Sequence, residues 1–188
     1  MKKSLVLFIS LFCFTATLSL FAGKPVTVKS GSPSVLKQSS TALLEIDLSA
    51  AKVGAKPLEE HLKSVKDGTL REVSDAKALV ENYFTARFNF LNKKKMQIVS
   101  YTDEVDYKIV VYVKVLDMGN DAGAFIPYAP STAGGVAING TADIIDMRTD
   151  NVVCTLNIDN VRGGASPTMR LRMAIAFQTL AEYICKLK

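Results

Sequence analysis

The sequence predicts an α+β domain with a mainly antiparallel sheet of four to five strands, helices packed on one face of that sheet, and a long C-terminal helix. Two observations support this fold class. Apolar and polar residues alternate in three successive segments, 107–115, 136–144 and 152–158, with the period of strands. Apolar residues then recur at intervals of three and four toward the C-terminus, with the period of a helix that lies across a sheet.

The N-terminal half predicts a strand, two helices and a second, short strand. Leucine and isoleucine alternate with acidic residues over 44–48, which favours a half-buried strand. Pro57 suits the first turn of a short helix, and Ser74 is placed to cap a longer one. The longer helix is predicted to end at the basic run 93–95, because cations favour a helix C-terminus, and 96–99 predicts the short strand.

The C-terminal half predicts a three-stranded antiparallel meander followed by the last helix. Val110 and Leu116 make the second face of the first of these strands partly apolar, which indicates a central strand. A polar turn at 148–151 joins the other two strands. Ser166 is predicted to cap the last helix, with Pro167 at its first position. The stripe of that helix predicted to lie in the core is Met169, Met173, Phe177, Leu180, Ile184 and Leu187.

The first 22 residues are predicted to form an export signal peptide. Lys2 and Lys3 lead into an apolar run from Leu5 to Ala22, after which the sequence turns polar. This run is too short for a confident membrane span, which needs about 20 apolar residues. Ala22 suits the position before cleavage, a second cleavage site lies at 17–19, and an uncleaved amino-terminal anchor is the alternative. The signal predicts a periplasmic or envelope-associated protein.

The remaining chain is predicted to hold one domain. Residues 23–41 are rich in Ser, Pro, Gly and Lys, and Pro25, Gly31 and Pro33 interrupt any regular pattern, so this segment is predicted to be irregular. Residues 42–188 are then predicted to form a single α+β domain, because the chain beyond the signal is long enough for one core and not comfortably for two.

The charge of the exported chain argues against nucleic-acid binding. Two of the 23 basic residues lie in the signal, which leaves 21 basic against 18 acidic residues and a net charge of +3. A nucleic-acid interface needs a basic stripe with interleaved aromatic residues. The one dense basic run, 93–95, instead follows an apolar helix, where it is expected to cap the helix end. We therefore expect no nucleic-acid partner.

Two cysteines, Cys154 and Cys185, remain beyond the signal. Cys154 alternates with apolar residues of a predicted strand, and Cys185 lies beside the apolar stripe of the last helix. An exported protein meets conditions in which disulfides form. The sequence leaves two alternatives open: a disulfide between Cys154 and Cys185, or two separate buried thiols that act as small apolar residues.

No arrangement of reactive residues predicts an enzyme. His61 is the only histidine, and neither Glu59 nor Glu60 has the spacing that would place it on a shared helical face with His61 for metal binding. Asp143 and Asp146 lie on opposite faces of one predicted strand, which argues against a joint acid–base role. The sequence therefore predicts no catalytic residue, no metal site and no cofactor.

The link at 119–135 has an unusual composition for a surface loop. Phe125, Ile126, Pro127 and Tyr128 are apolar where a hairpin tip is normally polar. We expect this tip either to pack over the sheet edge or to contact a protein partner or a membrane surface. The second alternative makes these four residues candidate partner-binding residues.

The C-terminal half carries a spaced set of residues around its predicted strands. These are Val105, Asp106, Tyr107, Ile109, Gly140, Ile144, Asp146, Thr149, Val152 and Val153. With the last helix, this pattern resembles the periplasmic α/β domain shared by curli-secretion-channel proteins, penicillin-binding-protein activators and the amino-terminal domain of the Tol-system β-propeller protein. The chain is also similar to a set of uncharacterised exported proteins of Bacteroidetes. The resemblance spans about residues 100–188 and implies this fold, an envelope location and a non-catalytic assembly or adaptor role.

These observations predict an exported, non-catalytic protein of the cell envelope that acts as an adaptor or assembly module and binds an envelope protein. The alternative is a carrier of a small molecule or lipid, in which the 119–135 link is a lid over a pocket between the sheet and the last helix. The oligomeric state is left open by the sequence, although an exposed edge strand at 43–48 would offer a surface for pairing between subunits.

Overall fold

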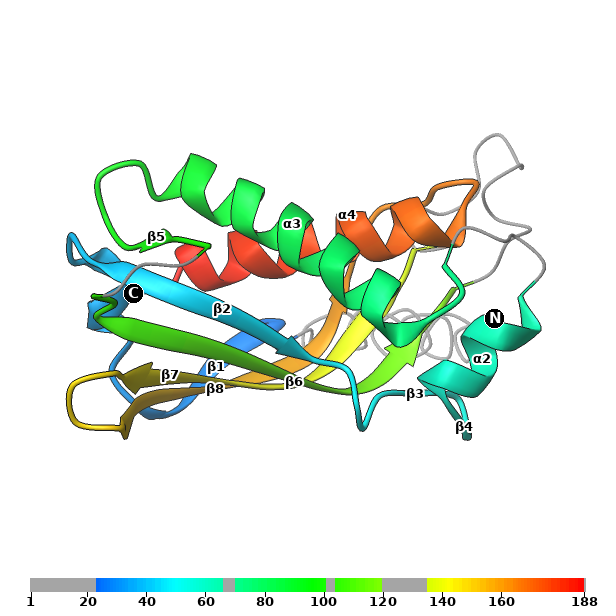
Figure 1. Cartoon of the computed structure of the whole chain (residues 1–188), viewed down its shortest axis with the longest axis horizontal. Coiled ribbons are helices and arrows are strands. Elements are labelled where there is room, and N and C mark those ends of the chain that lie inside the picture. Colours follow the sequence, from blue (N-terminus) through cyan, green and yellow to red (C-terminus); the bar gives the residue numbers. More distant parts are fainter. Residues whose placement is uncertain (1–22, 66–69, 101–103, 120–134, 188) are drawn as a thin grey trace, which may run out of the picture.

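Figure 1 presents the computed structural model of the chain, which describes residues 23–65, 70–100, 104–119 and 135–187. The strands are β1 (Val26–Gly31), β2 (Thr41–Asp47), β3 (Lys52–Val53), β4 (Lys56–Pro57), β5 (Gln97–Ile98), β6 (Tyr107–Asp117), β7 (Ala137–Asp146) and β8 (Asn151–Arg162). The helices are α2 (Leu58–Ser64), α3 (Val73–Leu91) and α4 (Met169–Cys185), with a short 3-10 helix, η1 (Pro33–Lys37).

The sheet is larger and more mixed than the sequence predicts. Among the described residues it has eight strands, six of them in the order β1-β8-β7-β6-β2-β5, with β3 beside β6 and β4 beside β3. The β1–β8, β8–β7, β7–β6 and β3–β4 pairs are antiparallel, whereas β2 runs parallel to both β6 and β5. The prediction of four to five strands was therefore wrong in the size of the sheet, although most of the pairing is antiparallel.

The extra strands come from segments that are short or bounded by breaker residues. Residues 23–41, predicted to be irregular, contain β1 and η1. Pro25 precedes β1, Gly31 ends it in a left-handed conformation (φ 74°), and Pro33 begins η1. These residues mark the ends of regular elements because proline fixes φ and glycine tolerates positive φ. The strands β3, β4 and β5 have two residues each, too few to show a periodic pattern.

A chain crossover that includes α2, α3 and β5 brings β2 and β6 together in parallel. Asp106, just before β6, fixes the start of this pair. Its Oδ2 accepts a hydrogen bond of 2.9 Å from the Thr41 backbone N–H and one of 3.3 Å from the Thr41 hydroxyl. The Ala42–Tyr107 register follows from this contact. Such a long-range parallel pair cannot be read from alternation, since alternation reports only which face each residue occupies.

The core lies between one face of the sheet and the pair of long helices, α3 and α4, which lie side by side over that face (Figure 1). Phe84 and Phe88 of α3 are fully buried and stacked, with ring centroids 5.9 Å apart. Met173 and Phe177 of α4 are also fully buried, which confirms their predicted place in the core. Met169, Leu180 and Ile184 of the predicted stripe are buried as well. Leu187, its last predicted residue, is half-buried and lies beyond the end of α4.

The ends of the two long helices differ from the predicted caps. Thr168, not Ser166, caps α4, and its hydroxyl oxygen accepts a hydrogen bond of 3.3 Å from the Leu171 N–H. The longer helix α3 begins at Val73, one residue before the predicted cap Ser74. Both differences are shifts of one or two residues, which is the usual uncertainty at a helix end. Among the described residues, no helix is long and apolar enough to cross a membrane.

Candidate functional site

The outer strand β1 is an edge of the sheet, paired on one side with β8 only. Asp159 N–H donates a 2.8 Å hydrogen bond to the Pro25 carbonyl, so the backbone groups of Pro25 and Thr27 face β8. In an antiparallel pair, alternate residues point their N–H and C=O groups to opposite sides. The backbone groups of Val26 and Val28 therefore point away from the sheet. None of the hydrogen bonds found among the described residues occupies these outward groups.

A cleft of about 530 Å³ lies between this edge and the C-terminal end of α4. Its lining is residues 24–28 together with Tyr183, Lys186 and Leu187. The Val26 side chain is 3% exposed and belongs to the core, whereas Val28, two residues along the same face, is 39% exposed. The cleft thus combines unpaired backbone groups, an exposed valine and two lysines, Lys24 and Lys186.

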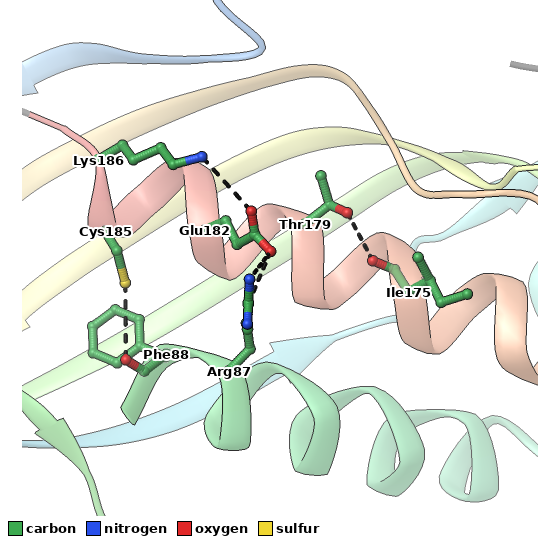
Figure 2. A network of polar contacts seen from close by, with 7 residues as sticks. All are labelled: Arg87, Phe88, Ile175, Thr179, Glu182, Cys185 and Lys186. Carbon is green, nitrogen blue, oxygen red and sulfur yellow. Dashed lines mark hydrogen bonds and ion pairs between the residues drawn. The ribbon is translucent and has the colours of Figure 1, made fainter. Parts of the chain in front are cut away.

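The α4 wall of the cleft is held by the polar network in Figure 2. Lys186 Nζ lies 3.7 Å from Glu182 Oε2, and Lys186 also lies over the Tyr183 ring, 5.8 Å from its centroid. Arg87 of α3 binds Glu182 Oε1 through Nε at 2.8 Å and through Nη2. This ion pair ties the last turn of α4 to α3, so the wall that faces β1 is fixed by the helix pair.

The opposite edge of the sheet, formed by β5 and β2, is closed by side chains of α3. Asn89 accepts a 2.7 Å hydrogen bond from Ile98 N–H and donates one of 2.8 Å to Ile98 C=O, as a neighbouring strand would. Glu81 Oε1 accepts a 3.0 Å hydrogen bond from Ile46 N–H in β2. A second cleft, of about 380 Å³, lies along this closed edge between α3 and the β2–β5 strands.

The edge strand predicted at 43–48 is therefore not a free edge. Its residues lie in and just after β2, an inner strand that pairs with β6 along its length and with β5 at Thr41 and Ala42. Beyond the end of β5, Glu81 of α3 accepts the hydrogen bond from the Ile46 N–H on this side of β2. The alternating pattern correctly indicates a strand at this position, but it contains no information about which neighbours cover that strand.

The candidate partner-binding residues Phe125, Ile126, Pro127 and Tyr128 lie outside the described residues, as does most of the predicted lid. The structure does describe the two ends of that link. Arg162 of β8 donates to Asp117 Oδ2 at 2.6 Å and to the Gly135 carbonyl at 3.0 Å, which joins both ends to one side chain. The hydrogen bond from Arg162 holds the pKa of the Asp117 carboxyl below its usual value.

The two cysteines occupy separate places as free thiols, so the structure contains no disulfide between them. Cys154 is buried in β8, opposite Gly31 of β1 and Ile144 of β7. Cys185 points its Sγ toward the Phe88 carbonyl of α3, at 3.9 Å (Figure 2). Burial raises the pKa of the Cys154 thiol and raises the pKa of Cys185 to about 12. Of the two alternatives left open by the sequence, the structure has the pair of separate thiols.

The polar residues weighed as chemical candidates lie apart or have structural partners. Partial burial, with a smaller effect of Lys56, lowers the pKa of His61 on α2. Asp143 accepts a 2.7 Å hydrogen bond from the Thr155 hydroxyl on the neighbouring strand. Asp146 accepts one of 2.9 Å from the Arg148 N–H in the β7–β8 turn. In the described part of the chain, no group of three or more His, Cys, Asp or Glu side chains is arranged to bind a metal ion.

The residues that carry the family resemblance have structural contacts in the described part of the chain. Asp106 pins the start of the β2–β6 pair, and Asp146 organises the β7–β8 turn. Gly140 lies where a Cβ atom would meet the Tyr112 carbonyl at 2.1 Å, so only glycine allows this approach of β7 to β6. These contacts give Asp106, Asp146 and Gly140 structural roles, and the resemblance itself stays a prediction.

Comparison with known proteins identifies no family. No family model matches the sequence, and no curated protein matches it. Among solved structures, two crystal forms of the PelC dodecamer from Paraburkholderia phytofirmans, one of them a point variant, align at 13% and 12% identity with TM-scores of 0.42 and 0.44. These alignments cover 84% and 83% of this chain and 95% and 96% of PelC.

Protein XCC0632 from Xanthomonas campestris, of the family DUF330, aligns at 16% identity with a TM-score of 0.38. This alignment covers 85% of this chain and 88% of XCC0632. Scores of this size are too low to transfer the assembly or the function of PelC or XCC0632 to this chain.

The open edge at β1 was not predicted, because residues 23–41 were expected to be irregular. One signal was present: Val26 and Val28 alternate with Thr27 and Lys29 immediately after Pro25, the pattern of a short edge strand. The breaker residues Pro25, Gly31 and Pro33 outweighed this signal, although they lie at or beyond its ends.

Proposed function

We propose that this chain is an exported, non-catalytic module of the cell envelope that binds an extended segment of a protein partner by strand addition at β1. The observation that supports this proposal most is the outward-facing backbone of Val26 and Val28 above the α4 cleft. An added strand would form main-chain hydrogen bonds with these groups, and alternate side chains would enter pockets below, as in other cases of strand addition.

The cleft offers a place for the side chains of the added strand. A strand placed beyond β1 presents every second side chain to the helix-covered face of the sheet. On that face its side chains would meet Val28 and Leu187, with the Tyr183 ring at the cleft wall. We expect aliphatic or aromatic residues of the partner at these positions, because their burial removes apolar area of both chains from water.

The charges around the cleft favour an acidic partner. Lys24 and Lys186 line the cleft, and Lys29 lies further along β1, whereas β1 itself contains no acidic residue. A second copy of β1 in antiparallel register would bring these lysines together, which like-charge repulsion disfavours. The partner segment is therefore expected to carry Asp or Glu residues beside its apolar positions.

The length of the contact is limited by the edge itself. The β1–β8 register shifts between Val28 and Ser30, which is a bulge at Lys29. Bulges and edge lysines are common devices that prevent indiscriminate strand pairing. We expect pairing along 25–28 only, with specificity from the cleft and a moderate affinity typical of a short interface.

The test uses the exported form of the chain in a crosslinked pull-down from the native cell envelope. Val28→Pro removes the outward N–H and leaves the β8 side of the ladder intact, because proline is tolerated at an edge where its nitrogen faces solvent. We expect this variant to lose a specific protein partner that the unchanged chain captures. Replacing Lys24 and Lys186 with serine should weaken capture of the same partner.

Two further variants test whether binding depends on β1 or on another surface of the molecule. Asn82→Ser with Thr85→Ser alters the second cleft and should leave capture unchanged. Phe125→Ser with Tyr128→Ser tests the apolar tip predicted from the sequence. Unchanged capture by a folded Val28→Pro variant, together with loss of capture by the Phe125→Ser, Tyr128→Ser variant, would contradict binding at β1. It would show that the partner binds the 119–135 link instead.

A further inference from the structure

We propose that the C-terminal end of α3 is a second, independent contact surface that binds the headgroup region of an anionic membrane. The surface consists of Arg87, Phe90, Leu91 and the exposed lysines 93–95, and is called the Phe90 surface below. Its central feature is Phe90, whose side chain is 59% exposed, the largest exposure among the large apolar residues of the described chain. Leu91 beside it is 38% exposed.

Cations surround the exposed ring. Lys93 Nζ lies 5.2 Å from the centroid of the Phe90 ring, and Arg87 Cζ lies 5.7 Å from it. Lys94 and Lys95 follow in the same turn and are exposed. The carboxylate that faces this group from α4 is Glu182, which is engaged by Arg87 and Lys186. The surface therefore keeps a clear excess of positive charge.

This combination matches the chemistry of a lipid surface. An aromatic ring inserts at the headgroup level, where its apolar area leaves water, while lysines and arginines beside it attract anionic lipids. Phosphatidylglycerol and similar lipids carry the complementary charge. Phe84 and Phe88 of the same helix are fully buried, whereas Phe90 is left exposed to solvent.

The position of the surface in the fold agrees with a membrane contact. Lys186 lines the same cleft as Lys24, the second residue of the described chain, and Glu182 links Lys186 to Arg87 of α3. Ion pairs thus lead from Arg87 of the Phe90 surface through Glu182 to Lys186, which lines one cleft with Lys24. Lys24 lies just after residues 1–22, the predicted export segment.

The test measures sedimentation of the exported form with vesicles of phosphatidylcholine alone or mixed with phosphatidylglycerol. We expect binding to the mixed vesicles only, reduced by added salt because the charges are exposed. Phe90→Ser should lower the partition coefficient by about tenfold, from the loss of one inserted apolar side chain. Replacing Lys93, Lys94 and Lys95 with serine should lower it by about a hundredfold, from the loss of three cations near the surface.

Matched controls remove the same groups elsewhere on the surface. Leu171→Ser takes away an apolar side chain that is 43% exposed, at the start of α4. Replacing Lys52, Lys56 and Lys114 with serine removes an equal charge from exposed strand residues. Both control variants should bind like the unchanged chain. The proposal is overturned if the unchanged chain does not bind the mixed vesicles, or if the controls lose as much binding as the Phe90 and lysine variants.

Discussion

The β5–β2 edge and the β1 edge of the sheet differ in what meets their backbone. At β5 and β2, Asn89 and Glu81 of α3 reach the strands and occupy the backbone groups of Ile98 and Ile46. At β1, the backbone groups of Val26 and Val28 face away from the sheet over a cleft. An edge that a helix closes adds to the stability of the fold, while an edge that stays open keeps its pairing capacity for another chain.

The first prediction compares a backbone N–H of β1 that faces β8 with one that faces away from the sheet. It has the largest expected effect on the free energy of unfolding. Thr27→Pro removes a donor to β8, so it should lower the free energy of unfolding by about 3 kcal/mol. Val28→Pro removes an outward donor, and the residue before it is already extended, so the loss should stay below about 1 kcal/mol. Urea unfolding followed by circular dichroism measures both. Equal losses would mean that the assigned direction of these groups is wrong.

The second prediction opens the closed edge at β5. Asn89→Ala leaves both backbone groups of the buried Ile98 without their side-chain partner, which should cost about 2 kcal/mol of unfolding free energy. Asn82→Ala is the matched control, since Asn82 is exposed on the same helix. Similar stabilities for the two variants in urea would show that Asn89 does not close this edge.

The third prediction tests the single contact at β2. Glu81→Ala removes the acceptor of the Ile46 N–H, so we expect a loss of about 1 kcal/mol in the same unfolding measurement. Glu81→Gln keeps an oxygen acceptor in nearly the same place and should retain most of the stability. If alanine and glutamine behave alike, the hydrogen bond contributes nothing measurable to the edge.

The fourth prediction uses the cysteines as reporters and involves no change in stability. Cys154 of β8 is buried opposite Gly31 of β1, and Cys185 at the end of α4 is half-buried against α3; both are free thiols. A pKa of about 12 against a usual 9.0 leaves Cys185 with roughly a thousandfold less thiolate below pH 9. Both thiols should react slowly with a thiol reagent at pH 8 and quickly in guanidinium. Fast reaction of Cys154 alone in the native chain would indicate that β1 detaches readily.

The periodic part of the fold could be predicted from the sequence. The strands β6, β7 and β8, the helix α4 and its core residues Met173 and Phe177 follow from alternation and from intervals of three and four. The parallel β2–β6 pair could not be predicted, because it depends on the contact between Thr41 and Asp106, 65 residues apart. The strands of two residues are too short for any periodic signal.

The candidate site was harder to predict because it depends on neighbours more than on composition. A free edge was predicted at 43–48, but Glu81 of α3 binds the backbone there. No strand was predicted at β1, because three breaker residues lie around its short alternating pattern. The exposure of Phe90 could not be predicted, since the exposure of one side chain is a property of the packed molecule. Edges and exposed surfaces become visible once the sheet order is known.

Amide hydrogen exchange on the isolated exported form tests the difference between the two edges most directly. We predict fast exchange at the outward-facing N–H of Val28 and strong protection at the N–H groups of Ile46 and Ile98, which α3 side chains occupy. Protection of Val28 as strong as that of Ile98 would contradict the account, because it would mean that the β1 edge is already covered.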